Sequence, residues 1–304
     1  MIIDMHAHIG DFRLSPDEPR EPLTWENLVA RLDEEGIDMA AMLPVYNASP
    51  EGAPGGVCLL DERMSVRDQV VDAGRYPGRI IPFGNMDPRW LHNSPASDFG
   101  PLLDWFLEHG CKGIGEVTAR LPFDDPRVVS MFRQIGEKGL VVTIESSGLE
   151  AGFYGLQDDP GAPRFERLLQ AVPGTTIIGH GPGFWAEISA IVTPADKWAY
   201  PKGPIQREGA LPRLLRTYPN LYADLSAFSG YNALTRDPEY GIHFLSEFQD
   251  KLFFGTDTCF ADPSGRMPQL GYLKGLLAEG KLSPAAYEKI VGGNARRVLR
   301  LDLS

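Results

Sequence analysis

The sequence predicts an α/β fold, a (β/α)8 TIM barrel with elaborated loops on the carboxyl-terminal face. Apolar runs of strand length alternate with helix-like segments along all 304 residues, which is typical of parallel strands joined by helices. The connections that follow strands are often long and rich in glycine, proline and aromatic residues, whereas those that follow helices are short. The chain has no internal repeat or linker, so we expect a single domain over residues 1–304.

The first half of the barrel is predicted to begin with a strand over residues 1–5. A helix over residues 24–35 follows, with Thr24 as its N-cap and Gly36 as its stop. The other segments of this half are strands at 37–43, 79–86 and 113–117 and helices at 62–74 and 97–109. Pro44 closes the second strand, and Gly110 ends the helix before the fourth.

The second half repeats the alternation. Helices are predicted at 125–138, 163–172, 207–218 and 238–248, and each leads to a strand, at 140–145, 175–179, 221–225 and 252–255. Two closing helices follow, at 267–279 and 284–301. The long loops at 44–61, 87–95, 148–163 and 182–206 should lie on the carboxyl-terminal rim, where such barrels hold their active sites.

Composition narrows the class of protein. Hydrophobic residues make up 43% of the chain, charged residues 23%, and the net charge is −12 without any basic block, which argues against nucleic acid or an anionic membrane as partner. Three cysteines without close spacing argue against a disulfide framework or a thiolate zinc site. Because no signal segment or membrane-length apolar run is present, we expect a cytoplasmic protein with a small-molecule substrate. A homo-oligomer is left open.

The strongest chemical signal is the pair His6 and His8 at the end of the first strand. Side chains two apart on a strand point to the same side, so both imidazoles could hold one metal ion. Four more ionisable residues stand at the ends of later strands: Glu116, Glu145, His180 and Asp257. Burying such groups together is costly without a cation or partner charges, so the barrel predicts one shared polar site.

Four motifs, in this order, resemble the metal-dependent amidohydrolase superfamily: Asp4-Met5-His6-Ala7-His8, Gly179-His180-Gly181-Pro182-Gly183, Phe254-Gly255-Thr256-Asp257 and Gly293-Asn294-Ala295-Arg296-Arg297. The resemblance is to the amidohydrolase-2 branch, which contains aminocarboxymuconate-semialdehyde decarboxylase. It implies that His6 and His8 ligate the metal and that Asp257 is a ligand or base. It also implies that His180 lies beside the metal and polarises substrate or passes protons.

One position departs from the family pattern. Strand five of the family usually ends in a metal-binding histidine within a His-Thr-Gly type turn, whereas this chain has Glu145-Ser146-Ser147-Gly148. Either Glu145 replaces the nitrogen ligand with an oxygen, which we favour because carboxylates bind Zn²⁺ and Mn²⁺ well, or the metal has changed or been lost. Glu116 either bridges two ions or forms a salt bridge with Lys112 or Arg120.

We therefore expect a divalent metal cofactor, Zn²⁺ first and Mn²⁺ as the alternative, as one or two ions about 3.5–4 Å apart if two are bound. The predicted function is a hydrolase of small lactones, amides or esters, in which the metal activates a water. Asp257, whose alternative role is a helix cap, would ligate or orient that water and take its proton. His180 would stabilise the oxyanion or protonate the leaving group.

Two other functions stay open. A decarboxylase of a small aromatic or unsaturated acid would place one ion opposite an arginine, and a binding protein on a degenerate barrel would hold no metal. Predicted substrate-binding residues are Arg120, Trp90 and Trp185, chosen from a wider set of loop residues. That set also includes Arg89, Phe153, Tyr154, Trp198, Tyr200, Lys202 and Arg266.

Overall fold

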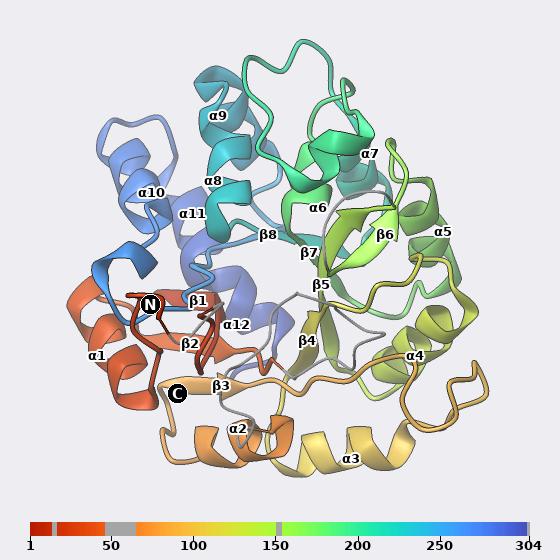
Figure 1. The fold of residues 1–304 in the computed structure, drawn as a ribbon. Coiled ribbons are helices and arrows are strands. Elements are labelled where there is room, and N and C mark those ends of the chain that lie inside the picture. The colour runs from red at the N-terminus through yellow and green to blue at the C-terminus, as the bar shows by residue number, and fades with distance from the viewer. Residues whose placement is uncertain (14–16, 46–64, 150–153, 303–304) are drawn as a thin grey trace.

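Strands occupy the centre of the molecule and helices surround them (Figure 1). The computed structural model describes residues 1–304 apart from 14–16, 46–64, 150–153 and 303–304. Most of the predicted loop at 44–61, the start of the predicted helix at 62–74, and the residues Cys58 and Phe153 lie outside the described residues.

Eight parallel strands of the described chain form two hydrogen-bonded sets. The first set is β1 (Ile3–Ala7), β2 (Met39–Met42) and β3 (Ile80–Pro82). The second is β4 (Gly113–Val117), β5 (Val141–Gly148), β7 (Ile177–His180), β8 (Leu221–Asp224) and β9 (Leu252–Phe253). These strands are the predicted ones, and most are shorter than expected from the sequence.

Two seams join the sets into a ring. At one seam the N–H of Gly84, just after β3, donates to the carbonyl of Gly113 in β4 at 2.9 Å. At the other, the N–H of Met5 in β1 donates to the carbonyl of Phe254, just after β9, at 2.9 Å. The first strand thus lies beside the last, and the predicted (β/α)8 barrel is confirmed.

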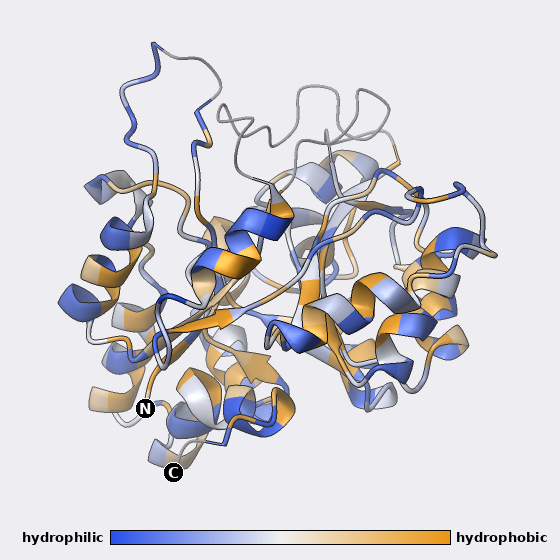
Figure 2. Ribbon diagram, turned by 90° about the horizontal axis from the view of Figure 1, so that it is seen from below, coloured by the Kyte–Doolittle hydropathy of each residue, from blue (hydrophilic) through white to orange (hydrophobic). Residues whose placement is uncertain are grey.

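The helices that cover the barrel largely coincide with those predicted. They are α1 (Trp25–Glu35), α2 (Val66–Ala73), α3 (Gly100–Glu108), α4 (Pro126–Glu137), α5 (Pro163–Ala171), α7 (Ala210–Thr217), α9 (Pro238–Glu247) and α10 (Gln269–Ala278). Thr24 caps α1 by accepting the N–H of Asn27, and Gly36 ends it in the left-handed conformation, as predicted. Apolar positions of these helices turn toward the strands (Figure 2).

Several elements were not predicted. They are the short strand β6 (Leu156–Asp158), the helices α6 (Pro182–Ala186) and α8 (Ala227–Thr235), and the 3₁₀ helices η1 (Pro194–Trp198) and η2 (Pro263–Gly265). The predicted closing helix at 284–301 is divided into α11 (Pro284–Glu288), a π segment η3 (Lys289–Gly293) and α12 (Asn294–Val298). Within η3 the carbonyl of Ile290 accepts the N–H of Phe254 at 2.9 Å, so this segment ties the closing helix to the barrel.

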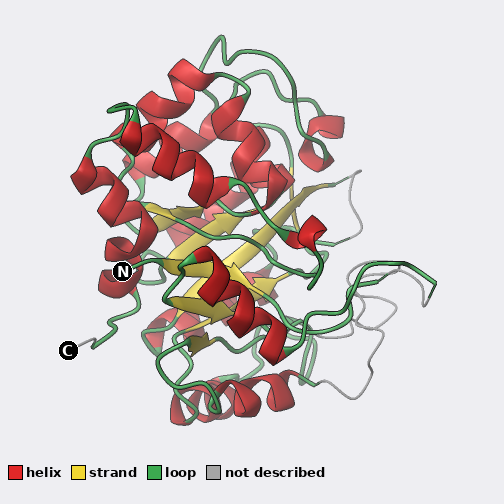
Figure 3. Cartoon of the chain, turned by 90° about the vertical axis from the view of Figure 1, so that its left-hand side faces the viewer, coloured by secondary structure: helices red, strands yellow, loops and turns green. Residues whose placement is uncertain are grey.

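Two apolar clusters hold the fold together. The larger lies between strands and helices, and the smaller, which includes Met5, Phe83 and Phe253, lies among the strands and reaches Leu299 beyond α12. Figure 3 shows both termini on one side of the molecule, beside the helices that flank the strands. In the part of the chain that the structure describes, no helix combines the length and apolarity needed to cross a membrane.

Candidate metal centre

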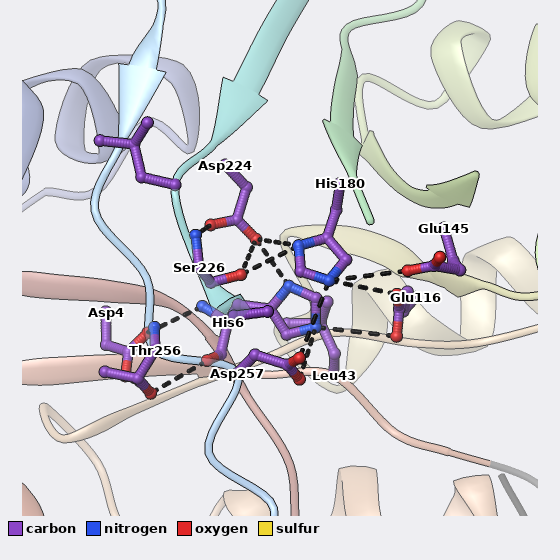
Figure 4. A network of polar contacts seen from close by, with 12 residues as sticks. Asp4, His6, Leu43, Glu116, Glu145, His180, Asp224, Ser226, Thr256 and Asp257 are labelled. Carbon is purple, nitrogen blue, oxygen red and sulfur yellow. Dashed lines mark hydrogen bonds and ion pairs between the residues drawn. The ribbon is translucent and has the colours of Figure 1, made fainter. Parts of the chain in front are cut away.

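The predicted ligands come together at one end of the barrel (Figure 4). His6 lies in β1, Glu116 in β4 and Glu145 in β5, while His180 is the last residue of β7. Asp257 follows β9 and completes the group. Parallel strands bring their carboxyl ends to the same face of a barrel, so residues far apart in the sequence share one site.

The first part of the centre is the His6–His8 pair. The two Nε2 atoms lie 3.0 Å apart, so both nitrogens point at the same small volume. His8 Nδ1 lies 2.8 Å from the carbonyl of Leu43, which can only accept a hydrogen bond. His8 therefore carries its proton on Nδ1 and presents Nε2 as a lone-pair donor.

The second part is the Glu145–His180 pair. The two residues are register partners on the neighbouring strands β5 and β7, and Glu145 Oε2 lies 3.6 Å from His180 Nε2. Glu145 is only 2% exposed, and its Oε1 has no hydrogen-bond partner in the described structure. A buried carboxylate oxygen without a partner is unusual, and it fits a site completed by a cation.

Glu116 and Asp257 span the two pairs. Oε2 of Glu116 faces His6 Nε2 at 3.7 Å, while its Oε1 faces His180 Nε2 at 3.8 Å. Asp257 repeats the arrangement, with Oδ1 at 3.1 Å from His8 Nε2 and Oδ2 at 3.8 Å from His180 Nε2. Each of these carboxylates thus offers one oxygen to each pair.

Asp257 is held in place by its backbone. Its φ is +60°, a left-handed conformation that aspartate tolerates better than most residues with a side chain. Its N–H donates to the carbonyl of His6 at 2.7 Å, which fixes the turn against β1. The side chain of Asp257 is 24% exposed, so it is the most open of the polar groups in the centre.

The two glutamates differ in their ionisation. Burial would raise the pKa of Glu116, but hydrogen bonding to His6 and the charges of the three histidines outweigh burial and lower it to about 2. Burial, and after it the charge of Glu116, raises the pKa of Glu145 well above its usual range. The pKa values of the two neighbouring glutamates are therefore shifted in opposite directions.

Sequence reasoning missed Asp224 and Ser226, which support the histidines from behind. Oδ2 of Asp224 lies 2.6 Å from His6 Nδ1. Burial lowers the pKa of His6, yet this hydrogen bond and the charge of Asp224 prevail and raise it well above the usual range. Asp224 is the last residue of β8, the seventh strand of the barrel. Glu145 and His180 also lie toward the ends of their strands, so this position in the sequence could have marked Asp224 as a site residue.

A cavity of about 70 Å³, partly open to solvent, leads to the centre. The described residues that line it include two aromatic side chains and three carboxylates, with no lysine or arginine: His8, Phe12, Val45, Asn85, Glu116, Thr118, Glu145, Tyr154, His180, Asp257 and Cys259.

None of the three predicted substrate-binding residues lines this cavity. Trp185 is a correction, because its indole is 2% exposed in the core and its Nε1 donates to the carbonyl of Asp224 at 3.0 Å. Trp90 is half-buried against the same apolar core, and Arg120 follows the lining residue Thr118. Substrate contact by Trp90 or Arg120 stays a prediction.

Among the described residues, the polar contacts of Glu116 favour a ligand role over the alternative salt bridge. Its carboxylate faces His6, His8 and His180, and it forms no ion pair with Lys112 or Arg120. The imidazole and carboxylate atoms present are those that Zn²⁺ and Mn²⁺ accept. The residues therefore fit a divalent metal.

Comparisons with known proteins agree with this architecture. Similar solved structures include a candidate 2-pyrone-4,6-dicarboxylic acid hydrolase from Pseudomonas putida, with 15% identity, a TM-score of 0.59 and coverage of 100% of this chain and 98% of that chain. 5-Carboxyvanillate decarboxylase from Sphingomonas paucimobilis is 17% identical, with a TM-score of 0.58 and coverage of 99% of each chain. 2,6-Dihydroxybenzoate decarboxylase from Rhizobium is 15% identical, with a TM-score of 0.57 and coverage of 99% of this chain and 98% of that chain. At these identities the likeness shows the fold.

The comparison with family models identifies the family, which the individual structures do not. No curated protein matches the chain. A family model described as amidohydrolase matches residues 3–301, a span that includes every motif from Asp4 to Arg297 on which the resemblance rested. This protein therefore belongs to the amidohydrolase family.

Proposed function

We propose that this protein is a metal-dependent hydrolase of a small, uncharged lactone, ester or amide, with two divalent cations in its centre. The observation that carries the proposal is the division of oxygens in Glu116 and Asp257, each of which faces both the His6–His8 pair and the Glu145–His180 pair. Carboxylates that bridge neighbouring ligand sets are a common means of holding two ions.

The residues would divide between the ions by proximity. His6 and His8 would hold one cation, and Glu145 and His180 the other, with Glu116 and Asp257 shared between them. Zn²⁺ is the first candidate and Mn²⁺ the second, since both accept imidazole and carboxylate ligands. When bound, such ions supply Lewis acidity, which polarises a carbonyl group and makes water a stronger acid.

Asp257 is the proposed general base. Its carboxylate is the most exposed of the group and borders the cavity, so it can accept a proton from an attacking water and pass it to the leaving group. His180 has two possible roles that depend on occupancy. With both cations bound, its Nε2 would be a ligand. With only the His6–His8 pair occupied, Nε2 would be free to carry a proton and pass it to the leaving group.

The lining of the cavity favours hydrolysis over decarboxylation. A decarboxylase needs a group that holds the substrate carboxylate, and arginine is the usual choice. Two arginines of the described chain form ion pairs with nearby aspartates: Arg13 with Asp11, and Arg89 with Asp87. The aromatic residues Phe12 and Tyr154 in the lining keep decarboxylation of an aromatic acid as the second candidate.

The test begins with metal analysis of protein purified without chelator. We expect two equivalents per chain in the wild type, loss of metal in His6→Ala, and a 10²- to 10⁴-fold lower kcat in Asp257→Asn, the range for general base catalysis. His243→Ala, which changes an exposed histidine outside the centre, is the matched control. Assays should cover lactones, esters, amides and, with CO₂ detection, aromatic acids.

Three outcomes would contradict the proposal. A metal-free wild type whose thermal stability does not change with Zn²⁺ or Mn²⁺ would favour a binding protein on the barrel. One ion per chain with CO₂ release would favour the decarboxylase. Turnover that survives in both His6→Ala and Asp257→Asn would remove these residues from the mechanism. Cytoplasmic location and a homo-oligomer stay predictions.

A further inference from the structure

Asp224 lies behind the centre, at the end of β8, and is completely buried. It does not line the cavity and touches neither Glu116 nor Glu145. Instead it lies between the two histidines His6 and His180, on the side of their rings that faces away from the cavity (Figure 4). A buried carboxylate in this position interacts with one histidine of the His6–His8 pair and with the histidine of the Glu145–His180 pair.

The contacts of Asp224 converge on one oxygen. Its Oδ2 lies 2.6 Å from His6 Nδ1 and accepts the hydroxyl of Ser226 at 2.7 Å. The same Ser226 Oγ lies 3.0 Å from His180 Nδ1, which is itself 3.3 Å from Asp224 Oδ2. Oδ1 accepts the N–H of Ser226 at 2.9 Å, so both oxygens are engaged.

The directions of these hydrogen bonds follow from the chemistry of the groups. An ionised carboxylate only accepts, so His6 must carry a proton on Nδ1. The Ser226 hydroxyl donates to Asp224, which leaves its oxygen to accept a hydrogen bond from His180 Nδ1. With one proton held on each Nδ1, each Nε2 becomes a lone-pair donor directed at the centre when a metal displaces any proton it carries.

The geometry points to Asp224 as a positioning residue that sets the tautomer and orientation of His6 directly and of His180 through Ser226, so that one carboxylate prepares both parts of the centre for metal. This inference rests on the proposed function. His8 stands outside this arrangement, because its Nδ1 donates to the carbonyl of Leu43. Asp224 therefore orients His6 and His180, one member of each pair, whereas His8 is oriented by the Leu43 carbonyl.

The surroundings pack closely against Asp224. A β-carbon at Gly255 would lie 2.5 Å from Asp224 Oδ1 and 3.3 Å from the β-carbon of His6. The Trp185 indole N–H donates to the Asp224 carbonyl at 3.0 Å, which fixes the backbone. The end of β8 is thus held from both sides, and the carboxylate stays aimed at the two histidines.

The decisive variant is Asp224→Asn, which keeps the shape and removes an acceptor. Its amide NH₂ must face either His6 Nδ1–H or the N–H of Ser226, so one donor meets another. If the NH₂ takes the Oδ2 position, His6 must move its proton to Nε2 and can no longer bind metal there. Ser226→Ala is the second variant, since it removes only the link to His180.

The measurement is Zn²⁺ binding to chelator-stripped protein, as stoichiometry by equilibrium dialysis and affinity by competition with a chromophoric chelator. For Asp224→Asn we expect both ions to bind about 10- to 100-fold more weakly, the usual effect of removing a group that orients ligands. For Ser226→Ala we expect one ion to weaken and the other to keep wild-type affinity. Histidine Nδ1–H proton resonances of the Zn²⁺-loaded protein provide a readout without turnover.

Asp158→Asn is the matched control, because Asp158 is equally buried but accepts backbone N–H groups at the start of α5, away from the centre. It should lose thermal stability and keep both ions. Wild-type affinity for both ions in folded Asp224→Asn would overturn the inference, and so would wild-type affinity in Ser226→Ala if Asp224→Asn does not fold. A wild type that binds no metal would instead overturn the proposed function.

Discussion

Gly181 and Glu145 share a space that holds only one side chain. A β-carbon added at Gly181 would lie 2.2 Å from Glu145 Oε1, and the φ of Gly181 is +91°, where residues with a side chain are strained. Gly181 directly follows His180. The turn that presents one member of the Glu145–His180 pair therefore also makes room for the other.

Gly181→Ala should displace the Glu145 carboxylate and release the second equivalent of Zn²⁺. Gly110→Ala is its matched control, because Gly110 has a φ of +79° with open space around it. Gly110→Ala should lose about 1–2 kcal/mol in the free energy of unfolding, the cost of a left-handed alanine. Gly181→Ala should lose more, because its β-carbon also overlaps the Glu145 carboxylate. Metal analysis reports the displacement of Glu145, and urea unfolding reports the loss of stability. Equal metal content in both variants would show that Gly181 is not needed to make room for the Glu145 carboxylate.

Tyr154→Phe should lower kcat/KM about 10-fold, the effect of one lost hydrogen bond between uncharged groups. Burial, and after it the charge of Glu145, raises the pKa of Tyr154 well above its usual range, so the phenol keeps its proton and can donate to a substrate. Its ring stands perpendicular to Trp198, with 5.1 Å between centroids. Steady-state kinetics provides the test, with Tyr287→Phe on α11 as control. An unchanged kcat/KM with unchanged metal content would argue against substrate contact.

Most of the barrel could be predicted because each strand is an apolar run between helix signals. The helix α8 was missed for a physical reason. It contains Ser229 and Gly230, and glycine in particular is a poor helix former, yet a β-carbon at Gly230 would lie 2.4 Å from the carbonyl of Leu225. The close approach of the chain at the entry to α8 thus requires a residue that helix propensity disfavours. The strand β6 likewise depends on pairing with β5, which no local pattern reveals.

The gathering of the candidate ligands in one place was predictable because polar residues at strand ends converge in a barrel. The division of oxygens in Glu116 was not, since it depends on side-chain directions across four strands. Trp185 was misassigned because α6, which carries it, was expected to be a rim loop. An aromatic residue in a loop suggests substrate contact, whereas the same residue on a helix packed against strands belongs to the core.

Asp4 should make stability depend on pH. It accepts the N–H of Thr256 at 2.9 Å and the Thr256 hydroxyl at 2.6 Å. Burial, partly offset by these hydrogen bonds, raises its pKa from 3.8 to about 7. Between these values the folded protein holds a proton that the unfolded chain has released. The stabilisation is complete below about pH 4 and is lost as the pH rises through about 7.

Asp4→Asn should remove this dependence. Its amide is accommodated because the Thr256 hydroxyl can turn to Thr258 Oγ1, 2.8 Å away. Relative to the variant, chelator-treated wild type should lose a few kcal/mol between about pH 4 and 8, because each pKa unit corresponds to about 1.4 kcal/mol. Urea unfolding across this range provides the measurement. Parallel curves for the two proteins would show that Asp4 titrates normally.

Lys197→Met should destabilise the protein by about 3–5 kcal/mol, because it leaves Glu187 buried and unpaired. Lys197 is 1% exposed, and its Nζ donates to Glu187 Oε1 at 2.8 Å and to the Gly183 carbonyl at 2.7 Å. The double variant with Glu187→Gln should recover part of the loss. Lys281→Met breaks an exposed pair and should cost at most about 1 kcal/mol. Similar urea midpoints for both single variants would count against the buried pair.

The seam between β1 and the segment after β9 has a consequence for how the protein matures. The ribosome makes His6 and His8 long before Asp257, and these residues meet only when Met5 pairs with Phe254. A nascent chain therefore presents two histidines without the aspartate that completes the proposed centre. The proposed centre is therefore complete only after this seam has formed, and proteolytic removal of the segment after β9 would take Asp257 away from it.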